Sequence, residues 1–496
     1  MTQKPASKER IMDLYKNMGL NFRSFVPLLS IYTGALENLE QIQKDESNDV
    51  NILSLYKKLL KLQIFNLIIN LDLSGFLRAN FRSTSNSEKR CNLKHINVIT
   101  IEGYNYLFGF GKDKGKAIFS IIKNLAELLN EEELIKDINT IEQIAKEFEN
   151  TFATRKDRDH RNLAIHYDSD PIKVYSLLSQ ISEDTETVRI CSFLKILDAL
   201  SVFTSNYLNK FEKYNIYSNI NCDIDIYEKL NQFPDLNNKL FNSLEHKLNS
   251  FVKHIDFIIN QIQLLKITQE KIDIENIYSE CFRQTIESIY PSIHICFIYL
   301  DLASAVRAYL SSEFYFEKQL NLRRLNIVVY EGFKHLYGYT ESDHINSFWH
   351  RNIIPILSNS SNHNQIDSLT KIEHKLKEVA SDKGINNMLL RECSVHYRYK
   401  KRDNIVTLFH ALVKSSPLME MKNSIKILNL LPQLIEINTD SVDFKYIMEK
   451  EKIKSHHIKT KNEFDKISSF FENLNIDPEK KQEMLNNINK IKNFLE

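Results

Sequence analysis

One long segment of this chain occurs twice, and the repeat restricts the folds that the chain can adopt. Residues 71–110 align with residues 300–339 at a constant offset of 229 without a gap, and 15 of the 40 positions are identical. Many of the other positions exchange similar residues, such as Val98 for Ile327. A repeat of this kind predicts two copies of one structural unit. A motif kept at matching positions in both copies therefore carries more weight than a motif found once.

The composition favours helices over strands. The chain of 496 residues has only 10 glycines and 9 prolines, which supply the many turns that strand-rich folds need. Apolar residues recur at helical spacing within 118–135, and segments 172–182 and 186–204 look amphipathic in the same way. Gly109 and Gly338 follow apolar segments at positions where a glycine commonly ends a helix. We therefore expect an all-α fold.

The repeat suggests a division of the chain into two helical-bundle units related by a pseudo-two-fold axis. An Asn-rich segment that contains Pro234 has the character of a connector, and the last part of the chain is charged, helix-prone and without a counterpart in the first half. The predicted segments are a first unit over 1–215, a connector over 216–239, a second unit over 240–430 and a C-terminal helical appendage over 431–496.

Several charged residues are kept in both repeats on otherwise apolar segments. Glu102 and Glu331 each precede a glycine, and we expect them to be structural, with a role in lining a cleft as the alternative. The other four have the same spacing in each copy and are expected to be buried polar anchors: Asp72 and Arg78 in the first, Asp301 and Arg307 in the second.

Nothing global in the sequence points to a membrane, a metal or nucleic acid. The net charge is +1, so a surface for RNA would have to be a local patch. Residues 1–20 lack the apolar core of a signal peptide, and the apolar stretches 59–77 and 293–306 are interrupted by polar residues and read as buried helices. The six cysteines lack zinc-like spacing and are interpreted as reduced core thiols. We expect a cytoplasmic protein with no membrane association, metal or cofactor.

The sequence Arg-x-x-x-x-His-Tyr occurs once in each half. The second copy lies within one residue of the place that the offset of the longer repeat predicts, although that offset is set independently. The first copy consists of Arg161, His166 and Tyr167, and the second consists of Arg391, His396 and Tyr397.

Arg-x-x-x-x-His is a short pattern, and only its repetition makes it informative. It occurs at two further places, which begin at Arg90 and Arg155. Neither of these has an arginine and a histidine at the matching positions of the other half. Only the pairs at Arg161 and Arg391 are kept in both copies, so they are the candidate site. The alternative is a structural network of ion pairs or hydrogen bonds where the two units meet.

An all-helical unit with an Arg-polar-x-x-x-His motif resembles the HEPN superfamily of small helical domains, and two such motifs in one chain resemble the tandem-HEPN ribonucleases. Asn162 stands at the polar position of the first motif, as is common in that family. Glu392 stands there in the second motif and departs from the commoner residue. The resemblance implies a metal-independent endoribonuclease whose active site forms across two units and whose nucleophile is the 2′-hydroxyl of the RNA.

The residue types suit that chemistry. A histidine near its ordinary pKa of about 6.5 can exchange protons at neutral pH, and an arginine can bind phosphate oxygens bidentately. Asn162 lies four residues before His166 and so shares its helix face, where it could orient the imidazole. Glu392 holds the same place before His396, and a carboxylate there favours the imidazolium.

Basic and aromatic residues flank both motifs. They could bind RNA phosphates and stack on bases, although a solvated helix face is the alternative explanation of the basic residues. Near the first motif they are Arg155, Lys156, Arg158 and Tyr167, and near the second they are Tyr397, Arg398, Lys400, Lys401 and Arg402.

We expect a tandem-HEPN-type endoribonuclease with RNA as its substrate. The resemblance further implies a toxin or antiphage defence effector that cuts cellular or phage RNA, and an antitoxin or regulatory protein and a homo-oligomer are left open as partners. Two alternatives stay open. One is a catalytically inert HEPN-like module that binds RNA or protein, and the other is an α-helical scaffold without a nucleic-acid role.

Overall fold

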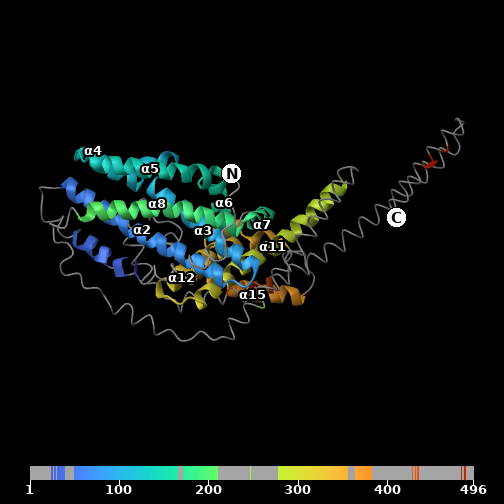
Figure 1. The fold of residues 1–496 in the computed structure, drawn as a ribbon. Helices are drawn as coiled ribbons and strands as arrows, with labels where there is room; N and C mark the ends of the chain where they lie inside the picture. Colours follow the sequence, from blue (N-terminus) through green and yellow to red (C-terminus); the bar gives the residue numbers. More distant parts are fainter. Residues whose placement is uncertain are drawn as a thin grey trace. The chain divides into compact units, whose positions relative to one another are not determined.

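The computed structural model is helical and contains no strand in the part of the chain that it describes, as expected for an all-α protein (Figure 1). The described residues are 24–39 except 26 and 30, 50–165, 171–209, 277–355 and 363–381, with a few isolated positions between 246 and 486. The chain divides into two compact units, which comprise residues 1–259 with 293–434, and residues 260–292 with 435–496.

Both copies of the repeat lie in the first compact unit. In the first half, α8 packs against both α2 and α5, and α3 packs against α2 and α6 (Figure 1). The elements of this half are α2 (Val50–Arg82), α3 (Asn86–Leu107), the 3-10 helix η1 (Gly111–Lys116), α4 (Ile118–Leu128), α5 (Glu132–Phe152), α6 (Arg155–Ile165), α7 (Pro171–Gln180) and α8 (Glu183–Asn209).

The second copy begins on α11, a helix whose residues from Ile293 onward belong to the first compact unit. Helix α12 packs against α2, so the two copies are in contact with each other. Both repeats lie in one compact unit, so the division of the structure into units does not test the predicted segment boundaries. Those boundaries stay predictions. The elements are α11 (Ile277–Leu310), α12 (Tyr315–Leu336), α13 (Glu341–Asn346), the π-helix η3 (Trp349–Ile353) and α15 (His363–Ser381).

One helix of each copy matches the other residue for residue. Helices α3 and α12 begin and end at corresponding positions of the repeat. Each is followed by a glycine in the left-handed region, Gly109 with φ 71° and Gly338 with φ 86°, which confirms their expected role as helix-ending glycines. A Cβ on Gly109 would lie 2.6 Å from the backbone of Asp113, and one on Gly338 would lie 2.6 Å from the backbone of Asp343. Asp343 stands one position later in the second copy than Asp113 does in the first. The one-residue difference between the offset of the long repeat and that of the Arg-x-x-x-x-His motifs therefore arises in this turn.

One set of buried ion pairs between the copies involves the matching aspartates. Arg323 of α12 donates to Asp72 of α2 at 2.6 Å, and Lys94 of α3 donates to Asp301 of α11. Lys94 and Arg323 occupy matching positions of the repeat, as do Asp72 and Asp301. The same contact therefore forms twice with the roles of the copies exchanged. Both aspartates are buried, which confirms that they are polar anchors.

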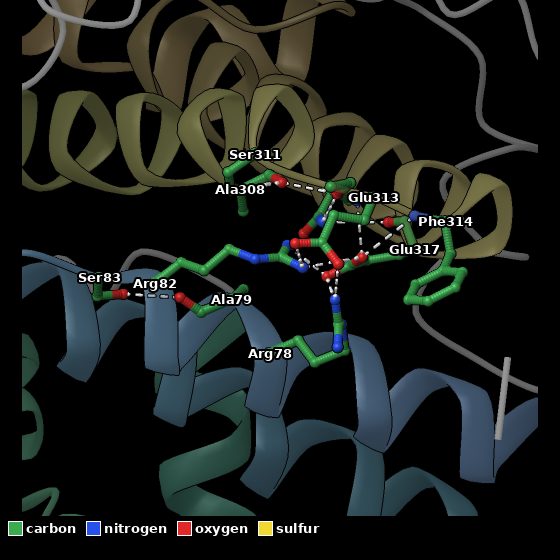
Figure 2. Close-up of polar contacts among 11 residues, drawn as sticks. Arg78, Ala79, Arg82, Ser83, Ala308, Ser311, Glu313, Phe314 and Glu317 are labelled. Atoms are coloured by element: carbon green, nitrogen blue, oxygen red, sulfur yellow. Dashed lines mark hydrogen bonds and ion pairs between the residues drawn. The ribbon is translucent and has the colours of Figure 1, made fainter. Parts of the chain in front are cut away.

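A second set of contacts is centred on a buried glutamate of α12 (Figure 2). Glu317 accepts from Arg82 at 2.6 Å and lies 3.4 Å from Nε of Arg78. Glu313 binds Arg78 at 2.6 Å. Glu317 is fully buried, so these arginines of α2 neutralise a charge that would otherwise be costly to bury.

The matching glutamate of the first copy makes the matching contact. Glu88 of α3 lies 3.3 Å from Arg307 of α11, as Glu317 lies beside Arg78. Each glutamate also accepts a backbone N–H at the start of its own helix, Glu88 from Thr84 and Glu317 from Glu313, both at 3.1 Å. One side chain thus caps its own helix and pairs with the other copy. Arg78 and Arg307 are buried, as expected.

The apolar segments 59–77 and 293–306 are buried helices, as expected. In the described part of the chain, one helical window, Ile293–Leu310, is long and apolar enough to span a membrane, but 94% of it is buried inside the protein. Such a window is also typical of a core helix, so it is weak evidence for a membrane span.

One expectation is refined and one needs correction. The helical spacing over 118–135 is confirmed, but it belongs to two helices, because α4 ends at Leu128 and Asn130 adopts a φ of 56° before α5 begins. Asn tolerates the left-handed region and can end a helix there. The cysteines were expected to be core thiols, and Cys91 and Cys296 are buried and free, but Cys191 is exposed.

We predict that Asp72→Ala lowers the free energy of unfolding by about 3–5 kcal/mol, because it leaves Arg323 buried without its carboxylate. Asp301→Ala should cost a similar amount through Lys94. The measurement is equilibrium urea denaturation. The control is Asp113→Ala, which removes only an exposed ion pair with Lys116 and should change stability by less than about 0.5 kcal/mol. Equal effects of Asp72→Ala and Asp113→Ala would contradict the assignment.

Candidate functional site

The first motif lies on α6, whose start is fixed by a capping network. Asp157 donates its backbone N–H to Thr154 Oγ1 at 3.3 Å and accepts from the Thr154 backbone at 3.1 Å. Arg189 of α8 binds Asp157 at 2.9 Å and the carbonyl oxygen of Phe152 at 2.7 Å. Burial alone would raise the pKa of Asp157, but hydrogen bonds from Thr154 and Arg189 outweigh it and lower this pKa. The carboxylate therefore stays charged and holds α6 to α8.

The end of α6 lies where the two copies of the repeat meet. Ala164 and Ile165, the last residues of the helix, belong to a small buried cluster with Val98 of α3 and Ile327 of α12. Val98 and Ile327 occupy the same position in the two copies. Helix α6 also packs directly against both α3 and α12. The residue that precedes His166 is thus buried between the copies.

Arg161 projects from α6 toward α3. Its guanidinium pairs with Glu102 of α3 and also donates to the side-chain oxygen of the exposed Asn162 at 2.7 Å. Only 15% of the Arg161 side chain is exposed. Glu102 is buried, so the glutamate kept in both copies directly contacts the arginine of the motif. This contact joins the structural role that we expected for Glu102 to the candidate site.

The other motif residues lie outside the described residues. Whether the two motifs converge on one cleft therefore stays a prediction, as does the contact expected between Asn162 and His166. The residues concerned are His166, Tyr167, Arg391, Glu392, His396, Tyr397, Arg398, Lys400, Lys401 and Arg402.

The basic residues at the start of α6 differ in their surroundings. Arg155 and Lys156 are exposed and available to a ligand. Arg158 is half-buried, with its guanidinium 4.7 Å from the ring centre of Phe110 and a hydrogen bond of 3.3 Å to the carbonyl oxygen of Ala153. Arg158 thus has a packing role in addition to any contact with RNA. Arg155 and Lys156 are solvated, which suits phosphate binding.

A cleft of about 280 Å³ lies beside the face of α6 that carries Lys156, His160 and Ala164. Its walls come from α3, α5, α6, α7 and α8, and Lys94, Glu186 and Arg189 are among its lining residues. Sequence reasoning did not find it, because the residues come from five helices and share no pattern. One signal was present: Asn97 in the cleft has an asparagine, Asn326, at its repeat position.

Within the described part of the chain, no group of three or more histidine, cysteine, aspartate or glutamate side chains could hold a metal ion. Comparison of the chain with protein family models, with curated proteins and with solved structures finds no match. What the site can do is therefore inferred from its residues and their geometry.

We predict that the free energy of unfolding of Glu186→Gln increases relative to that of the parent chain as the pH rises. Burial raises the pKa of Glu186 to about 7, despite its ion pair with Arg189 at 3.0 Å. A raised folded-state pKa gives stability that is fully present below the unfolded pKa and is lost as the pH rises through 7. The glutamine mimics the protonated acid and avoids this loss.

The stability difference between Glu186→Gln and the parent chain should therefore grow by an amount on the order of 1–3 kcal/mol between pH 5 and pH 8. Urea denaturation at several pH values measures it. Glu147→Gln, at an exposed position of α5, is the control and should leave the difference flat. Parallel stability curves for Glu186→Gln and the parent would show that Glu186 does not titrate in this range.

Proposed function

We propose that this protein is a metal-independent endoribonuclease of the tandem-HEPN type, built from two duplicated helical units related by a pseudo-two-fold axis. Its active site would be composite, with Arg161 and His166 from the first unit and Arg391 and His396 from the second. RNA is the substrate.

The observation that carries the proposal is the position of the end of α6. Val98 and Ile327 are repeat counterparts in one buried cluster. Counterparts that come together in this way lie close to the axis that relates the two copies. Ile165 belongs to the same cluster, and His166 is the next residue. If the second unit obeys the same symmetry, its motif would reach the same axis from the other side.

The exchanged ion pairs support the pseudo-two-fold. In a two-fold interface the same patch of each subunit is used, so that residue i contacts residue j and j contacts i. Arg323 with Asp72 and Lys94 with Asp301 follow this rule. A duplication fused into one chain would keep such an interface, and with it a site that lies across it.

The chemistry follows from the residue types. One histidine would accept the proton of the RNA 2′-hydroxyl as that oxygen bonds to phosphorus. The other would donate a proton to the 5′-oxygen as its bond to phosphorus breaks, which leaves a cyclic phosphate and a 5′-hydroxyl. Arg161 and Arg391 would bind the non-bridging oxygens. Glu102 holds the guanidinium of Arg161 in place, so an RNA phosphate would share that group with the carboxylate.

A second candidate function is an inert module of the same fold that binds RNA or protein. The observation that favours it is the ion pair of Arg161 with Glu102, which is also what a structural network would contain. Under either function the biological role that we propose is a cytoplasmic toxin or antiphage defence effector, regulated by an antitoxin or another protein.

We predict that His166→Ala abolishes cleavage of total RNA and leaves folding intact. A positioned acid or base contributes about 10²–10⁴-fold to a rate. In a composite site, His396→Ala alone should be as damaging as the double variant, because the two histidines act as a unit. Arg161→Ala should weaken both cleavage and RNA binding. Gel analysis of the RNA and circular dichroism of each variant test these points.

His374→Ala is the matched control, because His374 lies on the exposed face of α15 in a surface pair with Glu378. It should cleave like the parent. Half the parent activity in each single motif variant would indicate two independent sites. Full activity in the double variant would remove the ribonuclease assignment, and RNA that is bound but left intact by the parent would favour the inert module.

We predict that cleavage persists in excess EDTA, since the nucleophile is supplied by the RNA and not by a metal-bound water. The assay compares cleavage rates with EDTA and with added Mg²⁺ or Mn²⁺, after exhaustive dialysis. Activity that EDTA abolishes and either metal restores would contradict this mechanism while leaving RNA cleavage itself established.

A further inference from the structure

The cleft beside α6 contains a buried polar atom without a partner. Asn97 of α3 lines the cleft, is 7% exposed, and its side-chain oxygen accepts no hydrogen bond within the described structure. Buried polar groups are normally hydrogen-bonded, so an unpaired one calls for an explanation. A ligand in the cleft with an N–H donor would supply the missing partner once the Asn97 amide turns its oxygen toward the cleft.

Apart from the exposed Lys156, the charged groups that line the cleft are already paired with one another or with neighbours. Arg189 binds Asp157 at 2.9 Å and lies 3.0 Å from Glu186, and Lys94 binds Asp301. A strongly charged ligand inside the cleft would have to compete with these pairs. The remaining polar lining consists of amides and hydroxyls, including Asn97 and Thr185. This lining suits a neutral group that forms hydrogen bonds.

The cleft also has a flat wall and a cation at its edge. The imidazole of His160 lines it, and burial together with the nearby Lys156 lowers the His160 pKa, which favours the neutral ring. An aromatic ring of this kind is a surface on which a base can stack. Lys156 is exposed and also lines the cleft, where it could bind a phosphate. Ala164 and Leu177 add apolar surface.

The cleft and the motif share one helix. His160 in the cleft directly precedes Arg161, and successive residues of a helix are about 100° apart around its axis. The cleft therefore opens on the face of α6 next to the one that carries Arg161. Its volume of about 280 Å³ is just below the range of about 300–1,000 Å³ that ligand sites span, and it suits one planar ring system.

We infer that this cleft binds a nucleobase of the RNA, next to the phosphate that is cut, and so sets the base preference of cleavage. This inference rests on the proposed ribonuclease function. Asn97 accepts a hydrogen bond from an N–H on the edge of the base, His160 stacks on its face, and Lys156 contacts the adjoining phosphate.

The first experiment measures binding of AMP, GMP, CMP and UMP to the full chain by calorimetry, with ribose 5-phosphate as the probe that lacks a base. At least one nucleotide should bind at least tenfold more tightly than ribose 5-phosphate. Equal binding of ribose 5-phosphate would show that the cleft recognises phosphate only. If none of the four nucleotides bound at about 10 mM, roughly the weakest affinity of interest, the inference would also be overturned.

Thr185→Trp is the variant that fills the cleft, because Thr185 is exposed at its edge. The backbone N–H of residue 185 still reaches Ser182, as it does now at 3.2 Å, so the start of α8 should survive. The matched control is Ser192→Trp, which fills a neighbouring cavity of about 470 Å³ that α5 and α8 line and that shares only Thr151 with the cleft. Thr185→Trp should weaken nucleotide binding at least tenfold, and Ser192→Trp should leave it unchanged.

Asn97→Leu, a substitution of similar size, tests the hydrogen bond without filling the cleft. It should weaken the preferred nucleotide at least tenfold while circular dichroism shows an unchanged fold. Should the variant fail to fold, the binding data for Thr185→Trp decide the inference alone. Unchanged affinity in both Asn97→Leu and Thr185→Trp would refute it.

Sequencing of RNA ends separates the inference from the proposed function. If both hold, the parent prefers one base beside the cut, and Thr185→Trp loses that preference while it still cuts. Cutting with an identical base distribution in parent and Thr185→Trp would refute the cleft as a base site and leave the ribonuclease in place. Nucleotide binding that Thr185→Trp abolishes, in a protein that never cuts RNA, would support the base site and refute the ribonuclease.

Discussion

The arrangement of this protein depends on buried charges that are exchanged between its two repeats. Burying an ion pair costs much of what its attraction returns, so such pairs add little net stability. They are selective, however, because any other alignment of the repeats would leave a charge buried without a partner. Asp72 with Arg323 and Asp301 with Lys94 therefore specify which surfaces of the repeats meet. Once that alignment is set, Val98 and Ile327 come together, and the end of α6 packs on them.

The same alignment is tied to the formation of each helix. Glu88 and Glu317 bind backbone N–H groups at the start of α3 and α12 while they pair with arginines of the other repeat. Within this shared frame the side chains have diverged. A stacked aromatic pair of the first repeat, Phe65 with Tyr106, stands at the positions that a histidine pair occupies in the second, with ring centres 4.4 and 4.5 Å apart. The frame is thus kept by charges and capping, and the apolar contacts vary around it.

Much of this helical arrangement could be predicted from the sequence, because it depends on apolar periodicity and on the repeat. The all-α fold, the burial of Asp72 and Asp301 and the helix-ending glycines follow from local patterns. The partners of the buried charges could not be predicted, since Lys94 and Arg323 have no pattern that relates them to residues so far away in the chain. The break at Asn130 was missed because apolar spacing continues across it. The cleft beside α6 was missed because five helices build it, and only the asparagine kept at 97 and 326 gave a sign.

The pairing of Arg161 with Glu102 bears on how one residue can serve both structure and chemistry. A guanidinium has five N–H donors, and a carboxylate that binds it on one side fixes its plane without removing its charge. Fixing the plane lowers the entropy lost when a phosphate binds. The pair as a whole is neutral, so in the proposed ribonuclease the attraction for RNA would come from other cations, and Arg155 and Lys156 are exposed on the same helix. Affinity would then come from the solvated start of α6, and orientation from the buried contact of Arg161 with α3. Under that proposal a single contact would serve as a structural ion pair and would also position a catalytic arginine.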